Sequence, residues 1–142
     1  MTTIYQTIQN LRNAGLDQET IAKVLATRTP IQKKIDASER GEAVIFENLT
    51  IGSEFNRKSV YGAEFRNCTF TEDIIGAGFY SCDFSNCNFS NIFLSGCTFG
   101  TSNSRSRLNN CDFSKSELLD CAITQSQKRS CNVNGTHFWS SY

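Results

Sequence analysis

The residues of this chain most capable of chemistry are its seven cysteines. Three of them fall in the stretch YSCDFSNCNFSNIFLSGCTF, which spans residues 80–99. Thiolates at such a density could bind zinc, form disulfides or carry redox chemistry. Zinc is disfavoured because no CxxC pair stands beside a second pair or a histidine that would complete four ligands. An odd number of cysteines would also leave one unpaired in a full disulfide framework.

All seven cysteines share one position of a five-residue period. Their spacings are 14, 5, 10, 14, 10 and 10 residues, and each cysteine precedes an apolar residue by two positions. An unrelated cysteine would take that position about one time in five. Because free cysteine packs as a small hydrophobic side chain, we expect reduced, buried thiols that fill a core. The register also predicts that Cys68 lies beside Cys87, and Cys111 beside Cys131, on neighbouring turns of a repeating structure.

The other groups capable of chemistry lack partners at a useful spacing. His137 is the only histidine of the chain, and no serine and aspartate stand at a spacing that would suggest a catalytic triad with it. Carboxylates such as Glu64 and Asp112 fall at outward positions, where they lack the enclosed partner that general acid–base catalysis needs. We therefore predict no enzymatic activity, no metal site and no cofactor.

Charge and hydropathy exclude several classes of partner. The formal net charge is +0, so neither a strongly basic nor a strongly acidic surface is expected, and nucleic acid is disfavoured as a partner. No apolar run approaches the roughly 20 residues that span a bilayer, and the start of the chain does not resemble a secretory leader. These features predict a cytoplasmic protein that binds no membrane. If the protein is an effector, the alternative is delivery into a host cell.

From about residue 44 the apolar residues recur every five positions, which is the signature of a stacked repeat architecture. The central apolar series is Phe55, Val60, Phe65, Phe70, Phe79, Phe84, Phe89, Leu94, Phe99, Leu108, Phe113, Leu118, Ile123, Val133 and Phe138, with either Ile74 or Ile75 between Phe70 and Phe79. A second series of small residues precedes it by two positions and includes Ala63, Cys68, Ala77, Cys82, Cys87, Cys97, Cys111, Cys121 and Cys131. The phase slips by one residue between Phe70 and Phe79, and again between Phe99 and Leu108.

The blocks AEFRN CTFTE, CDFSN CNFSN and CDFSK SELLD CAITQ resemble the A(D/N)Lxx units of the pentapeptide-repeat family. The resemblance covers roughly residues 44–138, about two-thirds of the chain. It implies a mainly β fold, a right-handed quadrilateral parallel β-helix with four units per coil, in which both series point inward. One unit cannot bury its own apolar side chain, whereas coils stacked about 4.8 Å apart share a continuous core. We expect a little over four coils.

The residues before the repeat have helical periodicity. Three short helices are predicted, near residues 3–14, 17–26 and 30–38. Gly15 is a suitable helix C-cap, Asp17 a suitable N-cap, and Pro30 fits the first position of the third helix. We therefore divide the chain into a helical segment or cap, residues 1–41, and a solenoid, residues 42–142.

Two roles are open for the helical segment. The open edges of a β-helix need covering, and the segment could cap the first coil through Ile31, Ile35, Val44, Ile45 and Phe46. Alternatively, its second and third helices resemble a helix-turn-helix, with Lys33 and Lys34 on the later helix. The cap is favoured because the segment is only weakly basic.

The absence of a catalytic constellation favours a rigid module or scaffold that binds another protein, such as a bacterial or phage regulator or a secreted effector. The candidate partner-binding residues are Arg105 and Arg107, in the segment GTSNSRSRLNN that breaks the repeat, and Trp139 and Tyr142 near the C-terminus. The C-terminal aromatic residues could instead join two copies of the chain in a homodimer. Lys128 falls at an inward position, which a last coil open to water would tolerate.

Two alternative functions involve DNA. Some members of the family that the repeats resemble imitate a DNA duplex and modulate DNA gyrase, which requires rows of outward carboxylates. Residues 41–142 contain ten acidic and eight basic residues, a small excess for such mimicry. The other alternative is a DNA-binding regulator that acts through the helix-turn-helix-like segment. The sequence itself does not name the partner.

Overall fold

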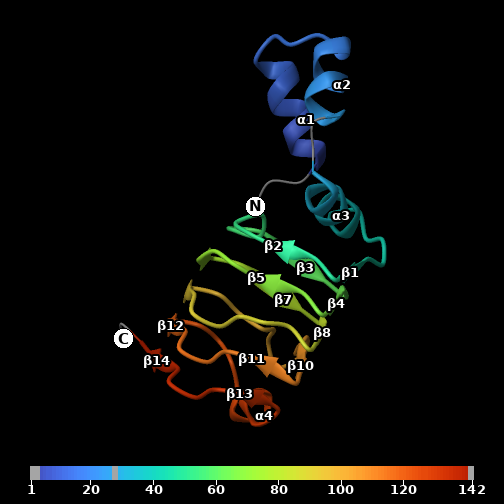
Figure 1. The fold of residues 1–142 in the computed structure, drawn as a ribbon. Coiled ribbons are helices and arrows are strands. Elements are labelled where there is room, and N and C mark those ends of the chain that lie inside the picture. The colour runs from blue at the N-terminus through green and yellow to red at the C-terminus, as the bar shows by residue number, and fades with distance from the viewer. Residues whose placement is uncertain (1–3, 27–28, 141–142) are drawn as a thin grey trace.

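Three helices precede the strands in the computed structural model, which describes residues 4–26 and 29–140. They are α1 (Ile4–Asn13), α2 (Gln18–Ala26) and α3 (Pro30–Glu39). The predicted N-terminal helical segment is therefore confirmed. Helices α1 and α2 pack against each other, and Figure 1 shows them beyond α3, away from the strands.

Short parallel strands follow and stack into four faces, which we name A to D. Face A contains β1 (Ile45–Glu47), β4 (Glu64–Arg66), β8 (Asp83–Ser85) and β10 (Arg107–Asn109). Face B contains β2 (Thr50–Ile51), β5 (Thr69–Phe70), β11 (Cys111–Asp112) and β13 (Cys131–Asn132). Face C contains β3 (Ser59–Tyr61) and β7 (Gly78–Tyr80). Face D contains β6 (Ile74–Ile75), β9 (Phe93–Ser95), β12 (Glu117–Leu119) and β14 (His137–Trp139).

Each turn of the chain visits the faces in the order A, B, D, C, so face A lies opposite face D. The predicted parallel β-helix is confirmed, and it has about 5 turns rather than a little over four. The extra turn comes from Phe46 and Ile51, which are fully buried and precede the predicted series. The sequence pattern missed them because Ile51 and Phe55 are four residues apart, which is a further one-residue slip.

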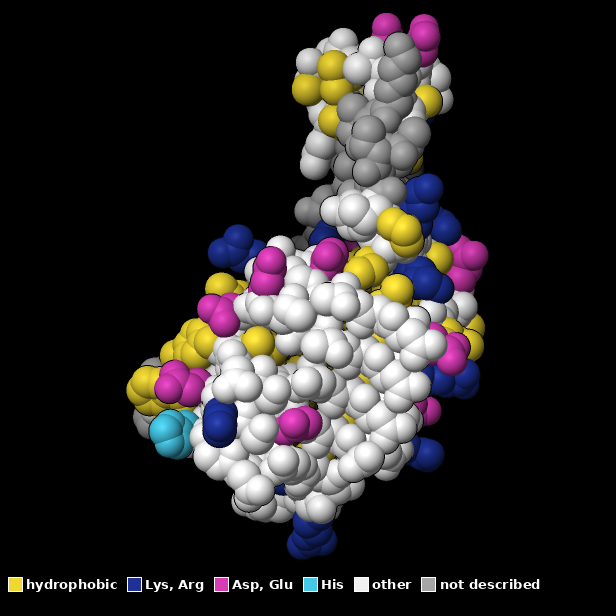
Figure 2. All heavy atoms as spheres, in the orientation of Figure 1, with side chains coloured by type: hydrophobic (Ala, Val, Ile, Leu, Met, Phe, Trp, Pro, Cys, Tyr) yellow, Lys and Arg dark blue, Asp and Glu magenta, His cyan; other side chains and the backbone are white. Residues whose placement is uncertain are grey.

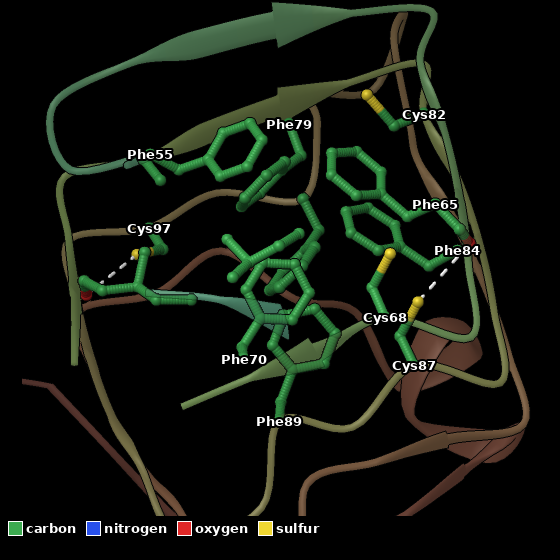
Figure 3. Close-up of a cluster of buried hydrophobic side chains, with 14 of the residues drawn as sticks. Phe55, Phe65, Cys68, Phe70, Phe79, Cys82, Phe84, Cys87, Phe89 and Cys97 are labelled. Atoms are coloured by element: carbon green, nitrogen blue, oxygen red, sulfur yellow. Dashed lines mark hydrogen bonds between the residues drawn. The ribbon is translucent and has the colours of Figure 1, made fainter. Parts of the chain in front are cut away.

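The core is a set of stacked phenylalanine rings, several of which Figure 3 shows. On face A, Phe65 stacks on Phe46 and on Phe84, with ring centroids 4.6 and 4.5 Å apart. Rings from adjacent faces meet edge to face, as Phe65 and Phe79 do at 87°. The residues buried in the core are Phe46, Ile51, Phe55, Val60, Phe65, Phe70, Ile74, Phe79, Phe84, Phe89, Leu94, Phe99, Leu108, Phe113 and Leu118 of the central series, with Ala63, Cys68, Ala77, Cys82, Cys87, Ile92, Cys97 and Cys111 beside them.

Burial is incomplete in the last turn. Ile123 and Val133 are partly buried, and the side chain of Phe138 is 37% exposed. Phe138 pairs in register with Leu118, so it keeps its place in the central series. It is left partly exposed because no further turn of the described chain covers it.

The corners of the coil explain the abundance of asparagine and glycine. The residue two positions after each of thirteen central residues has a positive φ: Asn48, Arg57, Gly62, Asn67, Gly76, Ser81, Asn86, Asn91, Gly96, Asn110, Lys115, Asp120 and Gly135. Glycine adopts this left-handed conformation without strain and asparagine tolerates it better than most residues. The fifth position of each unit is thus set by the turn of the backbone.

Helix α3 covers the first coil. It begins with a capping box, in which the Thr29 hydroxyl accepts from the Gln32 N–H and the Gln32 side chain accepts from the Thr29 N–H. Ile31 and Ile35 are buried in the same core cluster as Phe46. This packing corresponds to the predicted cap, except that Ile45 is 41% exposed because its side chain points outward from β1.

The fourth helix was not predicted from the sequence. Helix α4 (Gln125–Arg129) takes the place of a face A strand in the last turn and packs on β10. Its buried residue is Gln127, whose Nε2 donates to the backbone oxygens of Phe99 and Ser106 at 2.9 and 2.8 Å. The inward position predicted for Lys128 is therefore wrong by one residue. The Lys128 ammonium lies 3.9 Å from the ring centroid of Phe138.

Candidate interaction surfaces

The cysteines are packing residues. All seven are free, and Cys68, Cys82, Cys87, Cys97 and Cys111 are buried. Their thiols donate to backbone oxygens of the neighbouring turn, as Cys68 does to Phe46 at 3.2 Å and Cys97 to Ile74 at 3.3 Å. Burial raises the pKa of the Cys82 thiol to about 11, which disfavours the nucleophilic thiolate.

The predicted cysteine register is borne out. Cys111 pairs directly with Cys131, and the backbone N–H that follows Cys87 donates to the Cys68 oxygen at 2.8 Å. The Cys68 thiol contacts the Cys87 thiol, and this contact raises the pKa of Cys68. Cys121 and Cys131, in the last two turns, are only partly buried. The sulfurs on face B thus form a ladder whose outermost member is reachable from the C-terminal end.

Face D presents apolar side chains to solvent. Ile75 and Trp139 are 43% and 55% exposed, and Phe93 and Leu119 are partly exposed. Ile75, Ser95, Leu119 and Trp139 follow one another in one outward row, and Phe93 lies in the adjacent row of the same face. In Figure 2 the cyan His137, the only histidine of the chain, marks this side, and hydrophobic side chains gather beside it.

Polar groups flank the apolar surface of face D. Glu117 lies between Phe93 and His137 in the strand register, and the His137 Nδ1 is 4.0 Å from its carboxylate. Asp73 accepts from the Phe93 N–H at 3.0 Å. An apolar surface with a polar rim is the usual composition of a protein–protein interface. His137 is exposed on this surface and is not enclosed with a serine and an aspartate.

The outward residues of the other faces differ in character. Face A carries charges of both signs: Glu64, Asp83 and Arg107 follow one another in a single row across neighbouring strands, and Arg66 lies in the adjacent row. This arrangement differs from the continuous carboxylate row that DNA mimicry requires. Face B carries small polar side chains, chiefly Thr50, Thr69, Asn88, Asp112 and Asn132.

Face C carries one exposed aromatic pair. Tyr61 stacks on Tyr80 with ring centroids 4.9 Å apart, and Tyr61 is 58% exposed. No third aromatic ring continues this stack, because the next residue in register is Gly100. The loop that breaks the repeat begins there. Face D therefore has the larger apolar surface.

The break in the repeat forms a pocket. Residues 101–106 loop out between faces C and A, and a pocket of about 240 Å³ lies between β10 and α4, lined among others by Arg105 and Arg107. Both arginines are exposed, and Arg107 lies 3.9 Å from the Asp83 carboxylate. The structure thus brings two of the four candidate partner-binding residues together. Trp139 lies apart from them on face D, and Tyr142 lies outside the described residues.

Helix α3 packs against the coils. Lys34 donates from Nζ to the Ile45 oxygen at 2.7 Å, and Lys58 of the first coil lies 3.9 Å from Glu39. The helix that carries Lys33 and Lys34 is thereby used as a cap. This use lowers the support for a recognition helix, which has to project into a DNA groove.

Metal and membrane sites are not evident in the described parts of the chain. Within residues 4–26 and 29–140, no group of three or more histidine, cysteine or acidic side chains is placed to hold a metal ion. None of the helices described there combines the length and hydropathy of a membrane-spanning helix.

The family follows from the five-residue units and the four-faced coil. Residues 75–103 match the family model for pentapeptide repeats (8 copies). The chain contains pentapeptide repeats. The resemblance inferred from the sequence is thus confirmed.

The solved structures that match this chain are distant. A pentapeptide-repeat protein from the thylakoid lumen of Arabidopsis thaliana is 14% identical with a TM-score of 0.48, over 66% of this chain and 60% of that chain. QnrB1, a plasmid-mediated fluoroquinolone resistance protein, is 11% identical with a TM-score of 0.16, over 66% of this chain and 83% of that chain. The match thus spans about 60% of the length of the thylakoid protein. No curated protein matches the sequence.

Proposed function

We propose that this pentapeptide-repeat protein is a non-catalytic, rigid module that binds another protein through face D. The observation that supports this proposal is the exposed apolar surface formed by Ile75, Phe93, Leu119 and Trp139. A group of exposed apolar side chains on one face often marks an interface. Tryptophan is also the residue type most enriched among the energetic centres of interfaces.

The coil suits this role because it presents its side chains on a fixed frame. The strands of face D pair in register over several turns, and stacked aromatic rings fill the space behind them. A preformed surface loses little conformational entropy on binding. We also propose a cytoplasmic location, since free cysteines fit a reducing compartment.

Affinity purification with matched surface variants tests the proposal. Three tagged baits are compared: the wild type, the face D variant Ile75→Lys/Leu119→Lys and the face B variant Thr50→Lys/Thr71→Lys. The two variants add the same charge to different faces. We expect a stoichiometric protein partner with the wild type and the face B variant, and its loss with the face D variant. Retention of the same partner by all three baits would contradict binding through face D.

Self-association is a second candidate function for the C-terminal end of the coil. In the described chain, β13 pairs with β11 alone and β14 with β12 alone, so both strands leave one edge open. Open edges beside exposed apolar side chains favour pairing with another chain. Sedimentation velocity over a concentration series tests this candidate. A dimer that is lost with Phe138→Asp supports it, and a monomer at all concentrations contradicts it.

A further inference from the structure

Two carbonyl oxygens of the pocket beside α4, and that of Phe99 next to it, already accept hydrogen bonds. The Ser106 oxygen accepts from the Gln127 Nε2, and the Leu108 oxygen accepts from the Ser130 hydroxyl. The Phe99 oxygen accepts from the Gln127 side chain and from the Ser106 N–H. These three oxygens are therefore less available as acceptors for a ligand that donates hydrogen bonds.

The donors of the pocket are still available to a ligand. Arg105 makes one contact, from Nε to the Thr101 oxygen at 3.4 Å, which leaves both terminal nitrogens of its guanidinium outside that contact. The side chain of Arg107 is 80% exposed, and its ion pair with Asp83 is long, at 3.9 Å. Ser126 adds a hydroxyl at the rim. Guanidinium groups bind carboxylate and phosphate oxygens in a bidentate geometry.

The local charge is positive although the chain as a whole is neutral. Arg105 and Arg107 line the pocket, and Lys128 and Arg129 in the last turn of α4 lie outside that lining. Asp83 is the acidic partner of this group, through Arg107. The positive charge at the pocket thus comes from Arg105 of the loop and Arg107 of β10, whereas the Lys128 ammonium lies over the Phe138 ring at 3.9 Å.

We propose that this pocket binds an oxyanion, a carboxylate or a phosphate, on a peptide segment of a protein partner. Arg105 and Arg107 hold the oxyanion, and Ser126 donates a further hydrogen bond. The volume of about 240 Å³ fits one such group with the end of its side chain. The pocket belongs to the corner of faces C and A, away from face D, so the proposal does not depend on binding through face D.

Fluorescence anisotropy with labelled peptides tests the site on the full chain. The probes are a glutamate-rich peptide, its phosphoserine counterpart and its glutamine counterpart. We expect the glutamate or the phosphoserine peptide to bind and the glutamine peptide not to bind, and the two anionic probes identify which oxyanion is preferred. Binding should weaken at about 0.5 M salt, because exposed charges are then screened. Equal binding of the neutral probe would overturn the proposal.

Matched variants distinguish the pocket from charge in general. Arg105→Gln/Arg107→Gln should weaken binding of the anionic peptide by about tenfold or more, and Ser126→Glu should do the same by placing a carboxylate in the rim. The control Arg12→Gln/Arg66→Gln removes the same charge elsewhere and should leave binding unchanged. Circular dichroism establishes that each variant is folded. An equal loss in the control, or tighter binding of a single-stranded DNA oligomer that ignores Arg105 and Arg107, would overturn the proposal.

Discussion

At the scale of single residues, large and small side chains fill the interior of the coil from different positions of each unit. A phenylalanine or leucine fills the centre of the coil, and a cysteine, alanine or serine two positions earlier leaves room for it. Ser106 takes the position of Cys82 in the next turn and donates its hydroxyl to the Phe79 oxygen at 2.7 Å. Cysteine is therefore one of several small residues that satisfy the same geometry.

Phe84→Ala should lower the free energy of unfolding by about 3–5 kcal/mol, the usual cost of an unfilled phenylalanine cavity. Its ring is fully buried and lies 4.5 Å from the Phe65 ring and 5.2 Å from the Phe79 ring. Phe138→Ala is the control, because that side chain is 37% exposed, and it should cost about 1 kcal/mol. Urea unfolding measures both, and equal costs would contradict the stacked core.

The raised pKa of Cys82 predicts a pH dependence of stability. The folded state holds the pKa of this thiol at about 11, against an ordinary value of 9.0. Between these pH values the unfolded chain loses the proton and the folded chain keeps it, so stability is present below pH 9 and is lost as the pH rises to about 11. Cys82→Ser should remove about 2 kcal/mol of this loss. Urea unfolding at several pH values measures it, and parallel pH profiles of the two proteins would contradict it.

At the scale of elements, the two ends of the coil differ in how their terminal strands are covered. Helix α3 encloses the first turn by packing Ile31 and Ile35 in the core. Helix α4 covers the outer edge of β10 on face A alone, which leaves β13 and β14 as edges. The N-terminal end is thus a closed cap, and the C-terminal end is suited to contact with another chain.

Gln127→Ala should lower the free energy of unfolding by about 2–4 kcal/mol. The substitution removes the Gln127 donor from the Ser106 oxygen and leaves the Phe99 oxygen with the Ser106 N–H alone, and a buried polar group without its partner costs about 1–3 kcal/mol. Gln125→Ala, at an exposed position of the same helix, should change stability little. Thermal and urea unfolding compare the two, and similar values would contradict the anchoring of α4 through Gln127.

Much of this architecture could be predicted from the sequence because every unit contributes one large and one small inward residue. The choice between Ile74 and Ile75 could not, since both are apolar, and only the structure shows that Ile74 is buried and Ile75 is exposed. Gln127 was missed because it is polar, although a capping-box signal was present. Thr124 and Gln127 repeat the spacing of Thr29 and Gln32, and both pairs form capping boxes.

At the scale of the whole molecule, function depends on which outward residues share a face. The apolar surface of face D could not be predicted, because the slips in the repeat decide whether Ile75 and Leu119 align. At the pocket, Arg105 and Arg107 could be predicted from the sequence because they lie where the repeat breaks. The neighbouring helix α4 was not predicted. The partner-binding roles of Arg105, Arg107 and Trp139 remain predictions. The coil itself supports several distinct surfaces on one rigid frame.

Hydroxyl-radical footprinting of the complex with the captured partner tests most directly whether face D is the binding surface. The method reports the solvent exposure of reactive side chains, and face D offers Phe93, Leu119 and Trp139, while Tyr61 on face C serves as an internal control at 58% exposure. We predict that oxidation of the three face D residues falls on binding and that oxidation of Tyr61 is unchanged. Unchanged oxidation of Phe93, Leu119 and Trp139 in a saturated complex would contradict the account.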